Sequence, residues 1–519
     1  MVSEISSKDD KNQFPILPFN WQLTKIICIL NSLESGGRPK GGVRGIDSGI
    51  PSIGGEHLTY SGNFDFTNIR YIPLSFYEKM NKGKIQKKDV LVVKDGATTG
   101  KTSYVSENFA HTEAAVNEHI FILRVFHDYF SSKFLFYWFM SPFGQNCIKE
   151  NFQGTAQGGI TSNFIENSRL QVAPLAEQHR IVTKIEELLT QLDAGVASLK
   201  KVEAQLKRYR QSVLKAAFEG RLTQDWREVH KEEIEPASTL IDRINQARKK
   251  VASNKNDETP IDSTDLPPLP DNWRWIRLDN IVHIKGGITK DRKRIVENGR
   301  LIPYLRVANV QNGYLDLNEM KTIEADEAEI KDLSLKFGDI LFTEGGDRDK
   351  LGRGWIWQYE IPECIYQNHI FRARVYLNEI SSKYISWFGN THSQKYFMKK
   401  GKQTTNLASI SLTQLRAFPV AFPPAEEQQT IVTEIERYFS QIDHLEQTIT
   451  ISLRQAESLR QSLLKRAFEG KLVPQDPNDE PASILLERIK AEKARYATET
   501  KKGKTLQSSS PKRKIKNGN

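Results

Sequence analysis

The sequence is poor in the features that mark secreted, membrane-bound or metal-binding proteins. It has only three cysteines in 519 residues, and Cys28, Cys147 and Cys364 are isolated, without the spacing of metal ligands. The longest dense apolar run, residues 134–140, is far too short to cross a bilayer. The first residues are polar and lack the basic and apolar regions of a signal peptide. We therefore expect a cytoplasmic protein with no membrane partner.

Motifs of enzymes are also missing. Residues 96–102 resemble a phosphate-binding loop, but three residues separate the glycines where that motif needs four. A dinucleotide-binding Gly-x-Gly-x-x-Gly and the Asn/Asp-Pro-Pro-aromatic loop of amino-methyltransferases are both absent. His119 and His369 occupy equivalent positions, but the residues before them differ, so structural histidines are favoured over catalytic bases. The sequence predicts no catalytic, cofactor-binding or metal site.

Positive charge is concentrated at one end of the chain. The net charge is +10, of which +6 lies in residues 498–519, where we expect a disordered tail with at most an accessory role in phosphate contact. The other 497 residues carry only +4. Global charge is therefore weak evidence for nucleic-acid binding, and local clusters of basic residues must decide.

What the sequence does contain is an internal repeat with a constant offset of 250 residues. Between the matching segments the two copies diverge, which predicts one scaffold that carries two different surfaces. The matches include Glu177-Gln178 with Glu427-Gln428, Ile181-Val182-Thr183 with Ile431-Val432-Thr433, Ala217-Phe218-Glu219-Gly220 with Ala467-Phe468-Glu469-Gly470, Asp89 with Asp339, and His119 with His369.

Each copy ends in a segment with the pattern of a long amphipathic helix. Residues 177–218 contain no proline and no glycine except Gly195, and their apolar residues recur every three or four positions. At 1.5 Å per residue this predicts a rod of roughly 60 Å. Two such rods can bury their apolar faces as an antiparallel pair; a parallel pair, or pairing between chains, is the alternative. The predicted seam includes Val202, Tyr209, Leu445 and Ile449.

The predicted fold class is α+β, with two globular domains separated by a pair of long antiparallel α-helices (a coiled coil) and a pseudo-two-fold internal repeat. Short apolar runs between glycine-rich turns indicate the globular domains, and one helix is expected at residues 133–140. The predicted segments are a first domain (1–173), a first long helix (174–222), a short helix with a linker (223–265), a second domain (266–422), a second long helix (423–470), a trailing helix (471–497) and a basic disordered tail (498–519).

Three polar loops in each domain carry the residue types that contact DNA. Lys, Arg and Thr bind phosphates, and Arg, Lys, Gln and Asn read base edges in the major groove. One such loop is more often only a solvated surface, but three at corresponding places in both copies favour paired DNA readers. The predicted DNA-binding residues are Arg38, Lys40, Arg44, Lys94, Thr98, Thr99, Lys101, Thr155 and Gln157 in the first domain, and Lys290, Arg292, Lys293, Arg348, Lys350, Arg353, Lys402, Gln403 and Asn406 in the second.

The ends of the two rods carry a specific resemblance. They resemble the spacer regions of the DNA specificity subunits of type I restriction-modification systems, and the likeness covers nearly the whole chain. The openings at Trp21 and Trp273 and the loop from Asp95 to Lys101 are similar to the target recognition domains of that family. The spacer motifs are Pro174-Leu175-Ala176-Glu177-Gln178, Ala217-Phe218-Glu219-Gly220-Arg221-Leu222, Leu472-Val473-Pro474-Gln475-Asp476-Pro477 and Pro481-Ala482-Ser483.

This resemblance implies a non-catalytic subunit whose two domains each read one half of a split, asymmetric DNA sequence. The implied partners are double-stranded DNA, two methyltransferase subunits that bind S-adenosylmethionine and methylate adenine, and nuclease-translocase subunits that use ATP and magnesium. The chain itself would bind no cofactor. The helical repeats would dock the methyltransferase subunits, and the residues expected to do so are Glu177, Gln178, Glu219, Glu427, Gln428 and Glu469.

Two readers on one face of DNA must lie about one helical turn apart, which predicts half-sites of about three to five base pairs and a gap of roughly five to eight. One alternative is a coiled-coil adaptor whose globular domains bind other proteins. Another is a nuclease or methyltransferase with an unrecognised site. Salt-sensitive binding to a split DNA sequence would exclude the adaptor, and methyl transfer by the chain alone would support the enzyme.

Overall fold

The chain folds as two compact units in the computed structural model, which describes residues 15–154, 158–251, 261, 266–290, 296, 298–346, 351–400 and 408–508. Unit 1 comprises Met1–Leu199 and Thr450–Asn519, and unit 2 comprises Lys200–Ile449. The division therefore runs through both predicted rods. Each unit contains one globular domain together with one half of each long helix.

The globular domain of unit 1 is an α+β domain built on a four-stranded antiparallel sheet. A three-stranded sheet and a two-stranded pair complete the strands. In the large sheet the order is β2 (Leu30–Ser35), β8 (Ile120–Val125), β5 (Val90–Val93) and β6 (Thr102–Tyr104); the second sheet is β4 (Arg70–Ile72), β3 (Ile50–Ile53) and β7 (Ala115–Val116); and β1 (Gln22–Lys25) pairs with β9 (Arg169–Val172).

The expected helix at residues 133–140 is confirmed as α3 (Ser132–Met140), which packs on β5 and β6. Ser131 begins it, because its hydroxyl accepts a hydrogen bond from the Phe134 N–H at 3.3 Å. The other helices of this domain are α1 (Ile26–Ile29), α2 (Leu74–Lys79), α4 (Pro142–Glu150) and α5 (Phe164–Asn167).

Unit 2 repeats the same domain, as the 250-residue offset predicted. One further strand pair, β15 (Gly345–Gly346) with β19 (Ala408–Ser409), joins two of its loops. Its large sheet is β11 (Val282–Gly286), β18 (Ile370–Val375), β14 (Ile340–Thr343) and β16 (Gly354–Ile356); the second is β13 (Lys321–Ala325), β12 (Arg300–Leu305) and β17 (Ile365–Tyr366); β10 (Arg274–Arg277) pairs with β20 (Pro419–Phe422); and the helices are α9 (Leu278–Ile281), α10 (Glu327–Leu333), α11 (Ser382–Lys400) and α12 (Leu412–Arg416).

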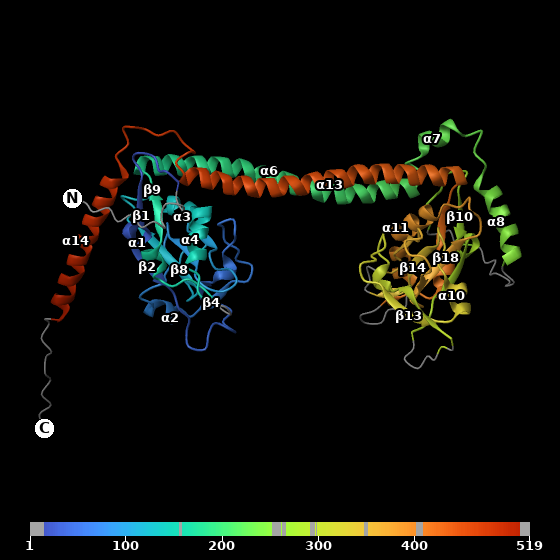
Figure 1. The fold of residues 1–519 in the computed structure, drawn as a ribbon, viewed down its shortest axis with the longest axis horizontal. Helices are drawn as coiled ribbons and strands as arrows, with labels where there is room; N and C mark the ends of the chain where they lie inside the picture. Colours follow the sequence, from blue (N-terminus) through green and yellow to red (C-terminus); the bar gives the residue numbers. More distant parts are fainter. Residues whose placement is uncertain are drawn as a thin grey trace, which may run out of the picture. The chain divides into compact units, whose positions relative to one another are not determined.

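The two predicted rods are single helices of 44 residues each, α6 (Leu175–Phe218) and α13 (Ala425–Phe468). In unit 1 the first half of α6 lies beside the second half of α13 (Figure 1). Arg460 of α13 forms an ion pair with Asp193 of α6. Nearer the start of α6, Arg180 contacts Asp479, which follows α13, at 2.6 Å. The two halves are therefore antiparallel.

In unit 2 the second half of α6 lies beside the first half of α13 in the same sense. Arg210 of α6 forms an ion pair with Asp443 of α13 at 2.5 Å. Beyond the end of α6, Arg227 reaches Glu427 at the start of α13, at 2.7 Å. The predicted antiparallel pairing is thus present in both units, and the parallel alternative is wrong.

Three positions of the predicted seam are exposed. Val202, Tyr209 and Leu445 are 41%, 48% and 47% exposed, whereas Ile449 is buried. A straight α-helix drifts by about 20° per heptad relative to a 3.5-residue repeat, so a seam drawn over 44 residues leaves the contact face at some positions. Two helices alone also cannot cover each other on all sides.

Each long helix ends at a glycine that packs on the other half of the repeat. Gly220 after α6 has φ +73°, and Gly470 after α13 has φ +69°, which favours glycine at both places. A side chain would also collide, because a Cβ on Gly220 would lie 2.5 Å from Pro270, and one on Gly470 would lie 2.3 Å from Pro18. The end of α6 therefore packs on the opening of the second domain, and the end of α13 packs on the opening of the first.

A buried glutamate joins each long helix to its domain. In unit 1 the Trp21 indole N–H donates to Glu177 at 3.0 Å, and the Gln475 amide donates to its other oxygen at 2.6 Å. Glu177 is 1% exposed, and burial raises the pKa of its carboxyl. The next residue, Gln178, is also buried; its side chain accepts from the Ser131 N–H at 3.0 Å and donates to the Ala173 carbonyl at 2.9 Å.

Unit 2 repeats this arrangement with a charged partner. Trp273 donates to Glu427 at 2.7 Å, as Trp21 does to Glu177. The other Glu427 oxygen accepts from Thr223 at 2.7 Å and from Arg227 at 2.7 Å, so a guanidinium stands where unit 1 has the amide of Gln475. Gln428 repeats the contacts of Gln178.

Further helices follow each long helix. After α7 (Gln224–Val229), α8 (Ala237–Val251) packs on α9, and α14 (Ala482–Ser508) packs on α1. The tail predicted to be disordered from residue 498 is partly helical, because α14 continues to Ser508. The part of α14 just before the tail, residues 490–497, is rich in Lys and Ala, which are strong helix formers. Residues 509–519 lie outside the described part of the chain.

Equivalent substitutions at the two glutamates should have unequal effects. In Glu427→Gln the Arg227 guanidinium loses its buried counter-charge, so we expect a loss of about 3 kcal/mol in the stability of unit 2. In Glu177→Gln the partners are neutral and the amide oxygen can still accept from Trp21, so the loss should stay within about 1 kcal/mol. Hydrogen exchange of each unit in the full chain would measure both. Equal losses would contradict the assigned role of Arg227.

Candidate nucleic-acid interface

Two of the predicted DNA-contacting loops of the first domain are tied together by their backbones. Residues 94–101 join β5 to β6, and residues 153–161 follow α4. The Ile160 N–H donates to the Lys94 carbonyl at 2.7 Å, and the Gly96 N–H donates to the Gly158 carbonyl at 3.1 Å. A Cβ on Gly159 would lie 2.4 Å from the Lys94 carbonyl oxygen, so this close approach requires glycine.

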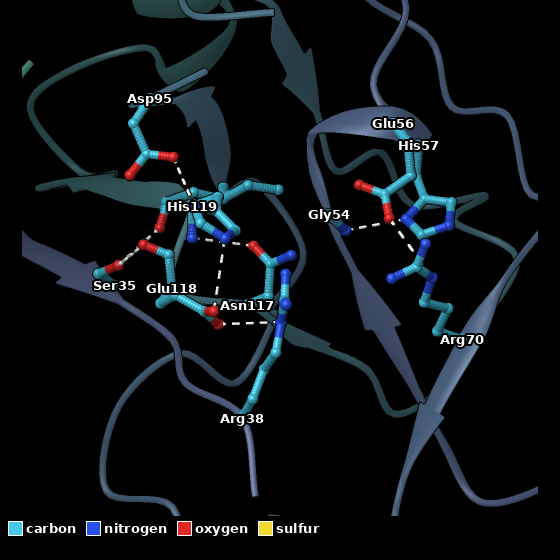
Figure 2. A network of polar contacts seen from close by, with 11 residues as sticks. Ser35, Arg38, Gly54, Glu56, His57, Arg70, Asp95, Asn117, Glu118 and His119 are labelled. Carbon is cyan, nitrogen blue, oxygen red and sulfur yellow. Dashed lines mark hydrogen bonds and ion pairs between the residues drawn. The ribbon is translucent and has the colours of Figure 1, made fainter. Parts of the chain in front are cut away.

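The third loop is connected to the first two through a polar network (Figure 2). Arg38, which follows β2, forms an ion pair with Glu118 at 3.1 Å. The other Glu118 oxygen lies 3.4 Å from His119 Nε2, and His119 Nδ1 lies 2.5 Å from Asp95 in the loop 94–101. The structure therefore brings the three predicted loops of the first domain together around His119.

His119 is a half-exposed residue rather than a core histidine, with 41% of its side chain accessible. The His119 backbone N–H donates to the Asn117 side chain at 2.9 Å, which stabilises the turn that precedes β8. The structural role predicted for His119 thus takes the form of a link between loops. The sequence analysis did not identify Asp95 and Glu118 as partners of His119. The histidine recurs at His369, and this repetition was the available signal that its contacts matter.

The second domain brings the described segments that border its loops together in the same way. The Glu344 N–H donates to the His369 carbonyl at 2.9 Å, and the Ile410 N–H donates to the Glu344 carbonyl at 2.8 Å. His369 Nδ1 lies 2.5 Å from the Glu344 carboxylate, which occupies the position of Lys94 in the first domain. The Asn368 N–H donates to the Ile288 carbonyl at 2.9 Å, and this bond joins the segment before His369 to the segment that leads to Lys290.

The β5–β6 and β14–β16 loops differ in length. In the first domain the Val93 N–H donates to the Lys101 carbonyl at 2.9 Å, and in the second the Thr343 N–H donates to the Arg353 carbonyl at 3.0 Å. Lys101 and Arg353 are therefore structural equivalents, although they are 252 residues apart, so the loop is two residues longer in the second domain. The constant offset of 250 does not hold here.

The predicted DNA-binding residues that the structure describes lie on these loops, and they differ in how exposed their side chains are. Lys40, Arg44 and Lys290 are exposed, and Arg353 is half-buried. Lys94 lies over the Phe121 ring at 5.3 Å, and the half-buried Thr99 donates to the Gly96 carbonyl at 2.7 Å. Lys101, over the Tyr60 ring, and Thr98 are half-buried. Thr155, Gln157, Arg292, Lys293, Arg348, Lys350, Lys402, Gln403 and Asn406 lie outside the described residues.

The predicted partner-docking residues are placed differently from the expectation. Glu177, Gln178, Glu427 and Gln428 are at most 1% exposed, and their polar atoms bond within their own units. In these positions they stabilise the fold, and their side chains are not accessible to a partner. Glu219 and Glu469, in contrast, are partly exposed at the helix ends, where they form ion pairs with neighbouring basic residues.

Within the described residues, no group of three or more His, Cys, Asp or Glu side chains has the arrangement of a metal site. No described helix is long and apolar enough to span a membrane.

Comparisons with known proteins agree with this architecture. The sequence model of the type I restriction modification DNA specificity domain matches residues 48–208 and 270–455. The specificity subunit of the type I restriction enzyme EcoKI from Escherichia coli K12 is 25% identical, over 86% of this chain and 89% of that protein. The specificity subunit of StySPI from Salmonella potsdam is 27% identical over the same shares.

Two solved structures share the fold. One, from a study of complex assembly and conformational transition in a type I restriction-modification system, has a TM-score of 0.62 at 16% identity and covers 88% of this chain and 99% of its own. The other, the HsdS subunit of Thermoanaerobacter tengcongensis, has a TM-score of 0.52 at 15% identity and covers 88% and 98%.

The contact between the first two loops can be tested at Gly159. In Gly159→Ala the new methyl group would overlap the backbone at Lys94, which should cost about 1–3 kcal/mol of loop pairing. We expect faster hydrogen exchange at the Gly96 and Ile160 amides and weaker binding to duplex DNA. Gly195→Ala is the matched control, since that glycine faces open space on α6 and alanine should stabilise the helix by up to about 1 kcal/mol. Unchanged exchange in Gly159→Ala would contradict the close packing.

Proposed function

This chain belongs to the family of type I restriction-modification DNA specificity subunits, and we propose that its two globular domains each read one half of a split, asymmetric DNA site. The chain is the non-catalytic DNA-recognition component of such a system. The adaptor alternative is not favoured, because the relatives along most of its length are specificity subunits.

One observation carries the proposal: in both domains the described segments at the ends of the polar loops meet near an equivalent histidine, on frameworks that match while the loop sequences differ. His119 and His369 each bond a carboxylate, but the surrounding residues are Lys94 in one domain and Glu344 in the other. Base edges are read by side chains of this kind, and phosphates are bound by the flanking cations. Different loops on the same framework are what two different half-sites require.

The partners follow from the family. The chain works with methyltransferase and restriction subunits as well as DNA. We propose that two methyltransferase subunits bind it, since the two units are repeats and each offers an equivalent half of the helix pair. S-adenosylmethionine would then belong to the methyltransferase subunits that modify adenine, and ATP and magnesium to the nuclease-translocase subunits.

The exposed face of the long helices is the proposed docking surface for the methyltransferase subunits. Val202, Tyr209 and Leu445 in unit 2, and Ile451 and Leu459 in unit 1, are 41–54% exposed although they are large and apolar. Large exposed apolar side chains mark a contact site where they form a continuous patch, and we propose such a patch on this face. These residues replace the buried Glu177, Gln178, Glu427 and Gln428 in the proposal, while Glu219 and Glu469 remain as polar contacts at the helix ends.

The long helices should set the gap between the half-sites. Inserting seven residues into α6 and seven into α13 preserves the antiparallel seam and lengthens each helix by about 10 Å, or roughly three base pairs of DNA. We expect both half-sites to be unchanged and the roughly five-to-eight-base-pair gap to grow by about three. Sequencing of methylated adenines in cells that express the variant with its methyltransferase would report both. A gap that keeps its original length would show that the long helices do not set it.

Salt dependence can separate phosphate contacts from base contacts. Lys40 and Arg44 are exposed on the third loop, so Lys40→Ala or Arg44→Ala should lower the slope of log affinity against log salt concentration by about 0.9 each. The loss should be the same for every DNA sequence. Lys87→Ala is the control, because Lys87 and Glu107 form an exposed ion pair at the opposite end of the β5–β6 hairpin. An unchanged slope in the loop variants would exclude them as phosphate ligands.

A further inference from the structure

Each domain displays one exposed tyrosine on a tight turn beside its candidate DNA-binding loops. Tyr60 is 73% exposed and Tyr314 is 57% exposed. Each lies inside a turn that an isolated antiparallel bridge closes, Leu58 with Phe64 and Val310 with Leu315. The two turns are thus equivalent, although the tyrosines occupy different positions in them: Tyr60 lies two residues before the left-handed Gly62, and Tyr314 directly follows the left-handed Gly313. Neither tyrosine belongs to the loops that the sequence pattern singled out.

The turn that carries Tyr60 is rigidly built. The Thr59 N–H donates to the Asn63 carbonyl at 3.0 Å, and the Ser103 hydroxyl of β6 donates to the same carbonyl at 2.8 Å. Gly62 has φ +87°, and a Cβ on it would lie 2.5 Å from the Phe136 ring of α3. The turn is therefore seated on α3 and β6, and its aromatic tip is held out from the domain.

The turn that carries Tyr314 is built in the same way. The Gln311 N–H donates to the Tyr314 carbonyl at 3.0 Å, and the Gly313 N–H donates to the Gly354 carbonyl at 3.3 Å. Gly313 has φ +83° and packs against Trp387 of α11, which would lie 3.2 Å from a Cβ at this position. Both turns thus combine a left-handed glycine, an aromatic support from a helix and an exposed tyrosine.

A cation accompanies each turn at the same place. The Lys101 ammonium lies 4.9 Å from the centre of the Tyr60 ring. Its structural equivalent in the second domain, Arg353, donates to the Val307 carbonyl at 3.4 Å, just before the turn of Tyr314. In the first domain the ring and the cation form one surface. The flat face of an aromatic ring matches a base, and a neighbouring cation matches the adjoining phosphate.

We propose that Tyr60 and Tyr314 are specificity-determining residues whose rings pack on a base of the half-site read by their own domain. An exposed ring forgoes the burial that usually stabilises aromatic side chains, and here a rigid turn holds one out in both copies of the repeat. Within the described residues neither hydroxyl has a hydrogen-bond partner, so no bond of the hydroxyl accounts for the position of the ring. We therefore assign the contact with the base to the ring face. This inference rests on the proposed reading of one half-site by each domain.

The test uses the full chain in complex with its methyltransferase subunits. Methylated-adenine sequencing of the wild type first defines the two half-sites, and duplexes are then made with both half-sites intact, with the first scrambled, or with the second scrambled. On the intact duplex, Tyr60→Ala and Tyr314→Ala should each weaken binding by about 5- to 150-fold, the range for loss of one aromatic contact to a base. Each loss should disappear when one half-site is scrambled, and the two variants should respond to opposite half-sites.

Conservative variants and controls make the result specific. Tyr60→Phe and Tyr314→Phe keep the ring and should bind within about twofold of the wild type. Phe19→Ala in unit 1 and Tyr359→Ala in unit 2 remove rings that are 99% and 58% exposed. Phe19 precedes β1, and Tyr359 follows β16 at the end of the β14–β16 hairpin opposite its loop, so both variants should bind like the wild type.

Three outcomes would overturn the proposal: unchanged affinity in both alanine variants, a loss that persists whichever half-site is scrambled, or a loss of methyltransferase subunits from the complex, which would make the turns a protein contact. A wild type that ignores both half-sites would instead refute the proposed function itself.

Discussion

A carboxylate buried at the start of each long helix is the interaction on which the arrangement of each unit depends. Burying a charged group costs several kcal/mol unless its oxygens are fully bonded. Few other residues could therefore replace the hydrogen-bond donors that surround Glu177 and Glu427. Each one accepts from a tryptophan in the globular domain and from a segment that follows the opposite long helix. The first turn of the helix supplies favourable backbone dipoles as well. Domain, helix and trailing segment are thereby fixed at a single point.

The structure separates what must stay constant from what can vary. The constant contacts are the buried glutamate, the glutamine that follows it, the glycine at the helix end and the ion pair of Asp89 with Arg124 or Asp339 with Arg374. The described parts of the loops are held by backbone hydrogen bonds and by a small number of polar side-chain contacts, among them a histidine–carboxylate pair in each domain. A loop can therefore exchange Lys94 for Glu344, or gain two residues before Arg353, without disturbing the core.

Much of this architecture could be predicted from the sequence because it is periodic or repeated. The spacing of apolar residues predicted α6 and α13, and the matched segments predicted two equivalent domains. The burial of Glu177 could not be foreseen, since glutamates are rarely buried and its partners lie 156 and 298 residues away. The meeting of Arg38, Glu118, His119 and Asp95 is likewise a long-range contact that spacing does not encode. The exposure of Tyr209 depends on how the two helices pack, which the spacing of apolar residues does not determine. The helical start of the tail depends on helix propensity, which the prediction of a disordered tail did not consider.

The split composition of unit 1 has a consequence for how the protein is made. Unit 2 is one continuous stretch of chain, so it can fold as soon as it leaves the ribosome. Unit 1 has to wait for its own C-terminal part, because Leu464 and Phe468 complete its hydrophobic core and Gln475 completes the shell of Glu177. Until those residues are translated, the first domain keeps an open apolar face. The part synthesised first is thus the last to be finished, and a prematurely terminated chain would leave it without its closing segments.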